Sequence, residues 1–312
     1  MLKILISAPY MILEIDRYRD IFKENNMDII IPKVNERLEE KELIKQIRDI
    51  DGVICGDDRF TKKVIDNANK LKVIVKWGTG MDSIDKLYAE KNGIKVYNTP
   101  NAFSEPVSDT VMAYMLAFAR KIVELDDLMK KGRWQKLRGL SLNESSLGII
   151  GVGNVGSMVA KKANAFGMKI YGNDIKKISD KIIRRYNIEM VELNYLLKKS
   201  DFISVNCDLN SSSHHLLDME KLKLMKKSAV LINTARGPII KENDLIYALE
   251  NNFLKGAALD VFEKEPLPID NPLRSMHNVL LASHNANSSS KYWEKVHENS
   301  INMLLKGLKE VR

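Results

Sequence analysis

The sequence predicts an α/β fold made of two domains, each built on a doubly wound parallel sheet. Short apolar runs alternate with helix-length amphipathic segments along nearly all of the 312 residues. This alternation is typical of βαβ units whose sheet is covered on both faces. The length also favours two domains over one, and the hydrophobic fraction of 45% is enough for large buried cores.

The first domain begins at the N-terminus with a strand. The opening run lacks the long apolar core and the cleavage site of a signal peptide. No apolar run is long enough to span a bilayer, so we expect a cytoplasmic protein without a membrane partner. Five strands are predicted in this domain, at Leu2–Ser7, Asp28–Pro32, Gly52–Cys55, Lys72–Lys76 and Lys95–Asn98.

A long apolar helix precedes the second domain. Its helical spacing begins near Val107 and continues towards Met129, and Gly132-Arg133-Trp134 ends it. The amphipathic tail Lys291–Val311 is too short to be a domain, so we expect it to pack back onto the first one. Six strands are predicted in the second domain, at Leu147–Val152, Lys169–Tyr171, Phe202–Asn206, Ala229–Asn233, Gly256–Asp260 and Val279–Ala282.

Charge and cysteine content exclude other classes of protein. The formal net charge is +8, but basic residues are interspersed with acidic ones and lack interleaved aromatics, which favours a solvated lysine-rich surface over a nucleic-acid site. Cys55 and Cys207 lie in apolar runs without CxxC spacing, so we expect free thiols and no metal site. His277 and His297 are expected at the surface.

A glycine-rich turn predicts a dinucleotide site. The sequence GVGNVG follows an apolar strand and opens an apolar-periodic helix. Its first glycine permits a tight turn, the second lets the backbone approach a pyrophosphate, and the third lets helix and strand pack closely. The diphosphate meets the unpaired N–H groups that begin the helix. The residues expected to bind cofactor here are Gly151, Gly153, Asn154, Val155 and Gly156.

An acidic residue about twenty positions further on identifies the cofactor. Asp174 follows the next predicted strand, where a carboxylate accepts hydrogen bonds from the adenosine ribose and repels a 2′-phosphate. Lys176 and Lys177 would neutralise it in part. The combination predicts a Rossmann domain that binds NAD in preference to NADP.

Polar residues gather at three strand ends of the second domain, where α/β sheets place their chemistry. These segments are 231–237 (LINTARG), 259–266 (LDVFEKEP) and 281–286 (LASHNA). Together with the loop GTGMDSID from residue 78, NTP, GRW and GVGNVG, they show that the sequence resembles the D-isomer-specific 2-hydroxyacid dehydrogenases. The resemblance runs from about Gly52 to the C-terminus.

The resemblance implies a lobed molecule in which one domain is inserted within the other. A Rossmann NAD-binding domain would occupy residues 100–287, and a flavodoxin-like substrate-binding domain would combine residues 1–99 and 288–312. It also implies a phosphoglycerate dehydrogenase-like homodimer that pairs through the long helix and the GRW segment. Further cofactor contacts implied by the resemblance are Thr110, Cys207, Thr234, Ala235 and Asp260.

By the same resemblance, Arg236, Glu265 and His284 form the catalytic set. A base must accept the hydroxyl proton when hydride leaves C2, and histidine exchanges protons near neutral pH. The glutamate would hold the imidazole tautomer and stabilise imidazolium. Glu263 competes for this role, but the family places its acid directly before proline. The arginine fork would bind carboxylate and carbonyl oxygens.

The family's substrate loop matches Trp77, Gly78, Thr79 and Gly80, whose backbone N–H groups would bind the substrate carboxylate. Lys76 precedes this loop, and we hypothesise that it meets a second anionic group such as a phosphate; a surface lysine is the alternative. The function implied is NAD-dependent hydride transfer at C2 of a small D-2-hydroxy or 2-keto acid, with 3-phosphoglycerate as one candidate. An NAD-sensing corepressor-like protein without turnover is the alternative function.

Overall fold

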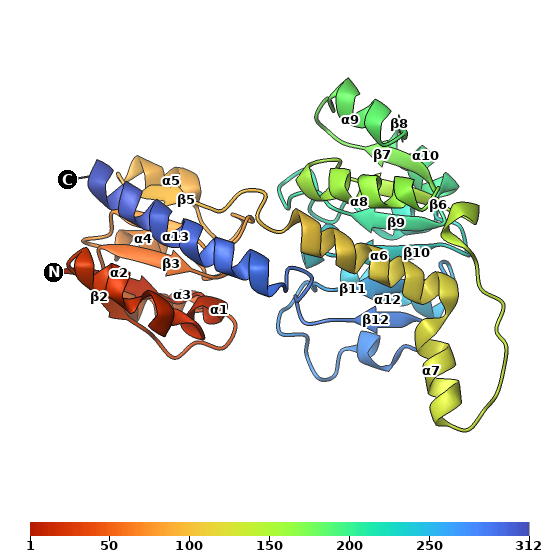
Figure 1. Cartoon of the computed structure of the whole chain (residues 1–312), viewed down its shortest axis with the longest axis horizontal. Coiled ribbons are helices and arrows are strands. Elements are labelled where there is room, and N and C mark those ends of the chain that lie inside the picture. The colour runs from red at the N-terminus through yellow and green to blue at the C-terminus, as the bar shows by residue number, and fades with distance from the viewer. Residues whose placement is uncertain (312) are drawn as a thin grey trace. The chain divides into compact units, whose positions relative to one another are not determined.

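The structure, a computed structural model, describes residues 1–311 and divides into two compact units. Unit 1 comprises Met1–Phe103 and Ser289–Arg312, and unit 2, Ser104–Ser288, is inserted between these two stretches of sequence (Figure 1). Each unit contains one parallel sheet, so the predicted α/β class with two parallel sheets is confirmed.

Unit 1 holds a five-stranded parallel sheet in the order β2-β1-β3-β4-β5. All five predicted strands are present, with ends that differ from the predicted ones by two residues at most. The order reverses between β1 and β3, and the carboxyl ends beside such a reversal are where open α/β sheets bind ligands. The strands are β1 (Leu2–Ile6), β2 (Met27–Ile30), β3 (Gly52–Cys55), β4 (Val73–Lys76) and β5 (Lys95–Tyr97).

Short helices and the C-terminal helix cover this sheet. The predicted return of the tail to the first domain is confirmed, because Gly307 packs so closely that an added Cβ would lie 2.8 Å from the Tyr97 ring and 2.9 Å from Val73. The helices of unit 1 are α1 (Pro9–Ile12), η1 (Ile15–Tyr18), α2 (Arg19–Glu24), α3 (Glu40–Ile47), α4 (Lys62–Asp66), α5 (Lys86–Lys91) and α13 (Ser290–Glu310).

Unit 2 holds a seven-stranded parallel sheet in the order β12-β11-β10-β9-β6-β7-β8. Six of its strands match predicted ones, and the seventh, β8, was not predicted. This edge strand has only three residues and fully buries only Ile188, so its sequence carries almost no periodicity. The strands are β6 (Ser146–Ile150), β7 (Lys169–Asn173), β8 (Ile188–Met190), β9 (Phe202–Val205), β10 (Val230–Asn233), β11 (Gly256–Leu259) and β12 (Val279–Leu281).

Two hydrophobic clusters, one on each face, cover the sheet of unit 2. Leu147 and Ile149 of β6 face one cluster, while Ile150 faces the other. The alternation follows from the two-residue repeat of a strand. Because all strands of this sheet are parallel, their carboxyl ends lie at one edge of it.

The long helix predicted from Val107 is interrupted. It begins earlier, at Ser104, and Lys121 between its two parts adopts a left-handed conformation with φ of 54°. Helical spacing alone does not reveal this break, because it continues across Lys121. The helices of unit 2 are α6 (Ser104–Arg120), α7 (Ile122–Lys130), η2 (Leu142–Glu144), α8 (Asn154–Ala165), α9 (Asp180–Arg185), α10 (Leu193–Lys199), α11 (Met219–Leu222), η3 (Gly237–Ile239), α12 (Glu242–Glu250) and η4 (Pro272–Ser275).

None of the helices within residues 1–311 is both long and apolar enough to cross a bilayer. Cys55 and Cys207 are both free thiols, as expected.

Candidate active site

The glycine turn between β6 and α8 has the geometry that the sequence predicted. Gly151 has φ of +89°, and a Cβ there would lie 2.6 Å from the Cys207 nitrogen. A Cβ on Gly156 would lie 2.0 Å from the Gly151 oxygen, so the close helix–strand contact requires glycine. A Cβ on Gly153 would meet no atom within 4 Å. The turn is therefore crowded where the chain packs and open where a ligand can approach.

Several donors beside this open turn fit a dinucleotide. Gly153 is the N-cap of α8 and carries no side chain to satisfy the first N–H groups of that helix, which favour an anion. Within the described chain, Thr234 has a buried hydroxyl with no hydrogen-bond partner, and such a group costs free energy unless a ligand or water pairs with it. Asn154 and Val155 form the first turn of α8.

Asp174 lies directly after β7 and beside the glycine turn. Its carboxylate accepts hydrogen bonds from the backbone N–H groups of Val152, at 2.7 Å, and Lys176, at 2.8 Å. These bonds fix the side chain at the edge of the turn, where the sequence motif requires an acid for the ribose.

Unit 2 also contains three further residues of the expected cofactor set: Thr110, Ala235 and Cys207. The Thr110 hydroxyl donates to the Ala286 carbonyl at 3.3 Å, and the Ala235 N–H donates to Asn233 Oδ1 at 3.0 Å. Burial raises the pKa of the Cys207 thiol to about 11, so that this side chain stays protonated at neutral pH and acts as a small apolar group.

Asp260 follows β11 and anchors the turn that carries His284. Its buried carboxylate accepts from the N–H groups of Asn285, at 2.8 Å, and Ala286, at 2.9 Å, while its carbonyl accepts from the His284 N–H at 2.7 Å. Burial raises the pKa of this carboxyl. His284 has φ of 53°, and these three bonds hold it in that unfavourable conformation. The sequence did not reveal this anchoring.

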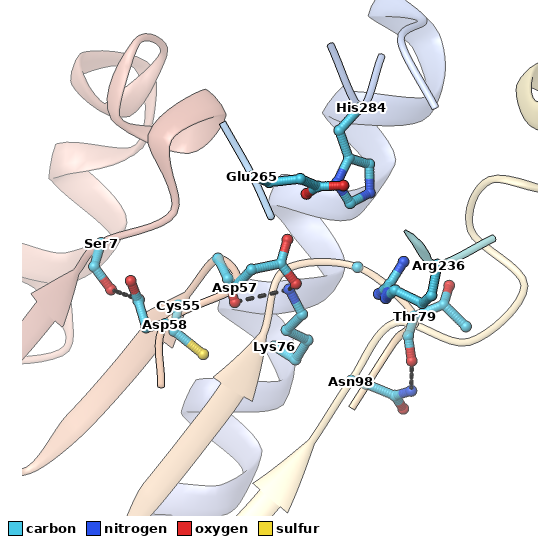
Figure 2. Close-up of polar contacts among 12 residues, drawn as sticks. Ser7, Cys55, Asp57, Asp58, Lys76, Thr79, Asn98, Arg236, Glu265 and His284 are labelled. Atoms are coloured by element: carbon cyan, nitrogen blue, oxygen red, sulfur yellow. Dashed lines mark hydrogen bonds and ion pairs between the residues drawn. The ribbon is translucent and has the colours of Figure 1, made fainter. Parts of the chain in front are cut away.

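The structure brings Glu265 and His284 together. Figure 2 shows the two side chains beside each other, and Nδ1 of the imidazole lies 3.0 Å from Oε2 of the carboxylate. The other carboxylate oxygen, Oε1, accepts from the Phe262 N–H at 2.9 Å. Glu263 faces elsewhere, since its Oε1 lies 2.8 Å from Nε2 of His215. A carboxylate on Nδ1 favours the neutral tautomer that carries its proton on Nδ1, so that Nε2 is the unprotonated nitrogen of that tautomer.

Arg236 begins the turn after β10. One guanidinium nitrogen donates to the Ala235 carbonyl at 2.9 Å, and the side chain is half-buried. The adjacent Gly237 passes so close to the chain after β11 that a Cβ would lie 1.9 Å from the Phe262 carbonyl carbon. This contact ties the segment bearing Arg236 to the segment that leads to Glu265.

In unit 1, two of the four N–H groups predicted to bind the substrate carboxylate already donate to other groups of the chain. The Trp77 N–H donates to the Cys55 carbonyl at 2.8 Å, and the Gly78 N–H donates to the Thr99 hydroxyl at 3.1 Å. In the part of the chain that the structure describes, the N–H groups of Thr79 and Gly80 have no acceptor. These two can bind an anion without breaking a bond.

Lys76 is neither a surface lysine nor an open phosphate contact. Its side chain is only 4% exposed, and Nζ donates to the Gly56 carbonyl at 2.7 Å and to Asp57 Oδ1 at 2.8 Å (Figure 2). The ammonium is therefore already paired with a carboxylate within unit 1.

His297 was expected at the surface, and this expectation is wrong. The residue is 2% exposed, and its Nδ1 accepts a hydrogen bond from the indole N–H of Trp77 at 2.9 Å. Burial lowers the pKa of the imidazole to about 4, so it is neutral at pH 7 and free to accept. The pairing joins positions 220 residues apart, which no local pattern reveals.

Comparison with known proteins identifies the family. Residues 112–286, most of unit 2, match the family model for the NAD binding domain of D-isomer specific 2-hydroxyacid dehydrogenases. The chain belongs to this family. Its cofactor is accordingly NAD, and its enzyme class is that of the NAD-dependent 2-hydroxyacid dehydrogenases.

Curated relatives extend the match into unit 1. A glyoxylate reductase of Thermofilum pendens is 38% identical over 276 residues, which cover 86% of this chain and 81% of the relative. A D-3-phosphoglycerate dehydrogenase of Methanocaldococcus jannaschii is 37% identical over 295 residues, covering 93% of this chain but 54% of the longer relative. A crystal structure of D-lactate dehydrogenase from Aquifex aeolicus, complexed with NAD and lactic acid, has a TM-score of 0.89 at 26% identity and covers 99% of this chain and 96% of its own.

Proposed function

We propose that this dehydrogenase transfers hydride between NAD(H) and C2 of a small D-2-hydroxy or 2-keto acid. The observation that carries the proposal is the Glu265–His284 pair, which lies in the same unit as the open glycine turn. A paired carboxylate and imidazole provide the proton transfer that hydride transfer at C2 requires.

His284 is the proposed acid–base residue. Glu265 accepts from Nδ1 and stabilises the imidazolium, so that Nε2 takes the substrate hydroxyl proton in oxidation and returns it in reduction. NAD supplies the hydride acceptor in oxidation and, as NADH, the donor in reduction. Asp260 is a positioning residue for this step, because its bonds to Asn285 and Ala286 hold the histidine turn.

Two groups are proposed to bind the substrate's oxygens. The guanidinium of Arg236 is a planar fork that matches a carboxylate and polarises a neighbouring carbonyl. The N–H groups of Thr79 and Gly80 suit the carboxylate, since they point to no acceptor in the described chain. The N–H groups of Trp77 and Gly78 then hold the shape of the loop, because they donate to Cys55 and Thr99 and not to the substrate.

The cofactor is proposed to lie along the glycine turn and the neighbouring strand ends. Gly151, Gly153 and Gly156 with the first turn of α8 would meet the diphosphate, Asp174 the ribose, and Thr234 would pair its buried hydroxyl with the cofactor. Thr110, Cys207, Ala235 and Asp260 stay in the proposed set as neighbours of these groups.

Phosphorylated substrates such as 3-phosphoglycerate are less well supported. The relative from Methanocaldococcus jannaschii carries the name of a phosphoglycerate dehydrogenase, but Lys76, the cation expected to meet the phosphate, is buried against Asp57. Because Asp57 already neutralises this ammonium, a second anion would have to compete with that carboxylate for it.

A panel assay tests the function. Purified protein is mixed with NADH and a series of 2-keto acids, and NADH oxidation is followed by absorbance. Turnover of at least one acid, abolished in His284→Ala, is expected. NADH binding without turnover of any acid would instead favour a sensor protein that acts by binding partners.

We also propose that the protein is a homodimer. Helix α7 buries none of its residues, and Ile122, Val123 and Met129 on it are each more than half exposed; Trp134 nearby in sequence is 86% exposed. Apolar side chains gathered in this way mark contact surfaces. Sedimentation should give a dimer for the wild type and a monomer for Trp134→Asp.

We further propose that the protein works in the cytoplasm. This is a reducing compartment, which fits the free thiols of Cys55 and Cys207.

A further inference from the structure

An aromatic cluster of unit 1 surrounds the start of the proposed substrate loop, and the proposed reaction does not use it. Trp77 is the residue directly after β4 and lies two positions before Thr79, whose N–H group has no acceptor in the described chain. Its ring centroid lies 5.5 Å from that of Tyr10, 5.5 Å from that of Phe103 and 5.9 Å from that of Trp293. Tyr10 and Trp293 also contact each other, with centroids 4.7 Å apart.

We propose that Tyr10 and Trp293, supported by Trp77, bind the side chain of a 2-keto acid whose C3 substituent is apolar and preferably aromatic. This inference rests on the proposed function and names its substrate class. The corresponding products are D-2-hydroxy acids with an aryl or branched alkyl side chain.

The placement of the cluster follows from the topology of the sheet. Tyr10 follows β1 and Trp77 follows β4, so both leave the carboxyl edge at which such sheets bind ligands. Tyr10 and Trp293 are half-buried, whereas Trp77 and Phe103 are buried. The partly exposed rings of Tyr10 and Trp293 are therefore the part of the cluster that we infer an apolar side chain contacts when its carboxylate is bound at Thr79.

Trp77 is held in one orientation. Its indole N–H donates to Nδ1 of His297, which α13 supplies from inside the unit. A buried indole N–H needs such a partner, and the bond prevents the ring from rotating. His297 is thus a positioning residue for the cluster, with no contact to substrate of its own.

The charges at the same strand ends disfavour a phosphorylated substituent. Asp57 neutralises Lys76 at 2.8 Å. Asp58 is fully buried and accepts from the Ser7 hydroxyl and the Leu38 N–H, each at 2.5 Å. Two carboxylates and one paired ammonium do not attract a dianion, whereas they do not affect an uncharged ring.

The test compares three 2-keto acids that differ at C3: phenylpyruvate, glyoxylate and 3-phosphohydroxypyruvate. With NADH, kcat/KM should be at least about 10-fold higher for phenylpyruvate than for the other two, because a filled apolar pocket discriminates by roughly 10- to 200-fold. Turnover of glyoxylate or the phosphorylated acid in preference would overturn the inference and leave the proposed function intact. No turnover of any acid would overturn the proposed function itself.

Two variants assign the preference to the cluster. Tyr10→Ala and Trp293→Ala should each lower kcat/KM for phenylpyruvate about 10-fold or more, and change it less than about 2-fold for glyoxylate. The matched control is Tyr195→Ala in unit 2, which removes a half-exposed ring that meets Tyr171 edge to face, with the ring centroids 5.8 Å apart; it should change the kcat/KM of neither acid. Equal losses for both acids would show a structural cluster only and overturn the inference.

The positioning role of His297 has its own readout. His297→Leu removes the acceptor of the indole N–H and leaves Trp77 itself in place, so KM for phenylpyruvate should rise several-fold while kcat for the same acid changes less than about 2-fold. Thermal unfolding of each variant confirms that it is folded. A His297→Leu protein with unchanged KM for phenylpyruvate would overturn the role given to the hydrogen bond.

Discussion

The two units place polar residues at the same edge of similar sheets and treat their charges in opposite ways. In unit 2, Glu265 and His284 are paired but half-buried, with about a fifth of each side chain exposed. In unit 1, Lys76 is almost fully buried and paired with Asp57. The first arrangement leaves the proposed acid–base pair partly exposed to solvent, whereas the second buries its charges and uses them to fix the chain. The same topology therefore carries a proposed catalytic pair in one unit and a structural ion pair in the other.

The largest expected effect breaks the pair in unit 2. Replacing His284 by alanine removes the proton acceptor, and kcat for any 2-keto acid that the wild type reduces should fall about 10³-fold. NADH affinity should change little. His214→Ala, at an exposed histidine, is the matched control and should retain full activity. A His284→Ala protein with more than a tenth of wild-type kcat would contradict the assignment.

The next effect concerns stability and belongs to unit 1. Burial raises the pKa of Asp58 from 3.8 to about 6. Above pH 4 the unfolded carboxyl is ionised while the folded one keeps its proton, so this residue lowers the free energy of unfolding by about 3 kcal/mol as pH rises from 4 to 6.

His297 acts in the opposite direction over the same range. Burial lowers its pKa from 6.5 to about 4, so the unfolded imidazole gains a proton below pH 6.5 while the folded one does not. The free energy of unfolding therefore falls by about 3 kcal/mol as pH falls from 6.5 to 4. In the wild type the two trends oppose each other.

Single variants separate these trends. Urea unfolding between pH 4 and 6.5 should show that Asp58→Asn becomes more stable with rising pH, because the histidine trend is left. His297→Gln should become less stable with rising pH, because the aspartate trend is left. Parallel pH profiles for the two variants would show that these buried groups are not the cause.

A smaller effect distinguishes the two glutamates of unit 2. Glu265→Gln keeps the side-chain shape but removes the charge that stabilises imidazolium, and kcat should fall about 30-fold, which corresponds to ~2 kcal/mol. Glu263→Gln, on the His215 side, should lower kcat less than about 3-fold. Steady-state kinetics checks both, and similar losses would remove the preference for Glu265.

The smallest expected effect uses the unpaired hydroxyl of Thr234. Thr234→Val replaces that buried group by a methyl, so the cofactor-free protein should gain about 1 kcal/mol in the free energy of unfolding. NADH affinity should fall several-fold, because the hydroxyl's proposed partner is the cofactor. Calorimetry of free and NADH-bound protein measures both quantities. A gain in stability without a loss of affinity would place the hydroxyl outside the cofactor site.

Local patterns carried most of what could be predicted. Strand and helix alternation gave eleven of the twelve strands of the structure, and GVGNVG with Asp174 gave the cofactor turn. The missed strand β8 is too short for a periodic pattern, and the break at Lys121 is a single left-handed residue. Contacts between residues far apart in the sequence were harder to predict. Spacing alone did not decide whether Glu263 or Glu265 pairs with His284, and only the fold shows that the two glutamates contact different histidines.

What the sequence determined by itself is the Rossmann turn, the acid at position 174 and the presence of arginine, glutamate and histidine at strand ends, because each depends on residues a few positions apart. Only the tertiary structure decided which charged side chains are buried in ion pairs and which stay partly exposed. Lys76 looks identical in sequence whether open or buried, yet the register of β3 beside β4 places Asp57 next to it. His297 likewise meets Trp77 only because α13 returns to the sheet. Burial and long-range pairing are properties of the packed chain, and these set the charge and shape offered to a substrate.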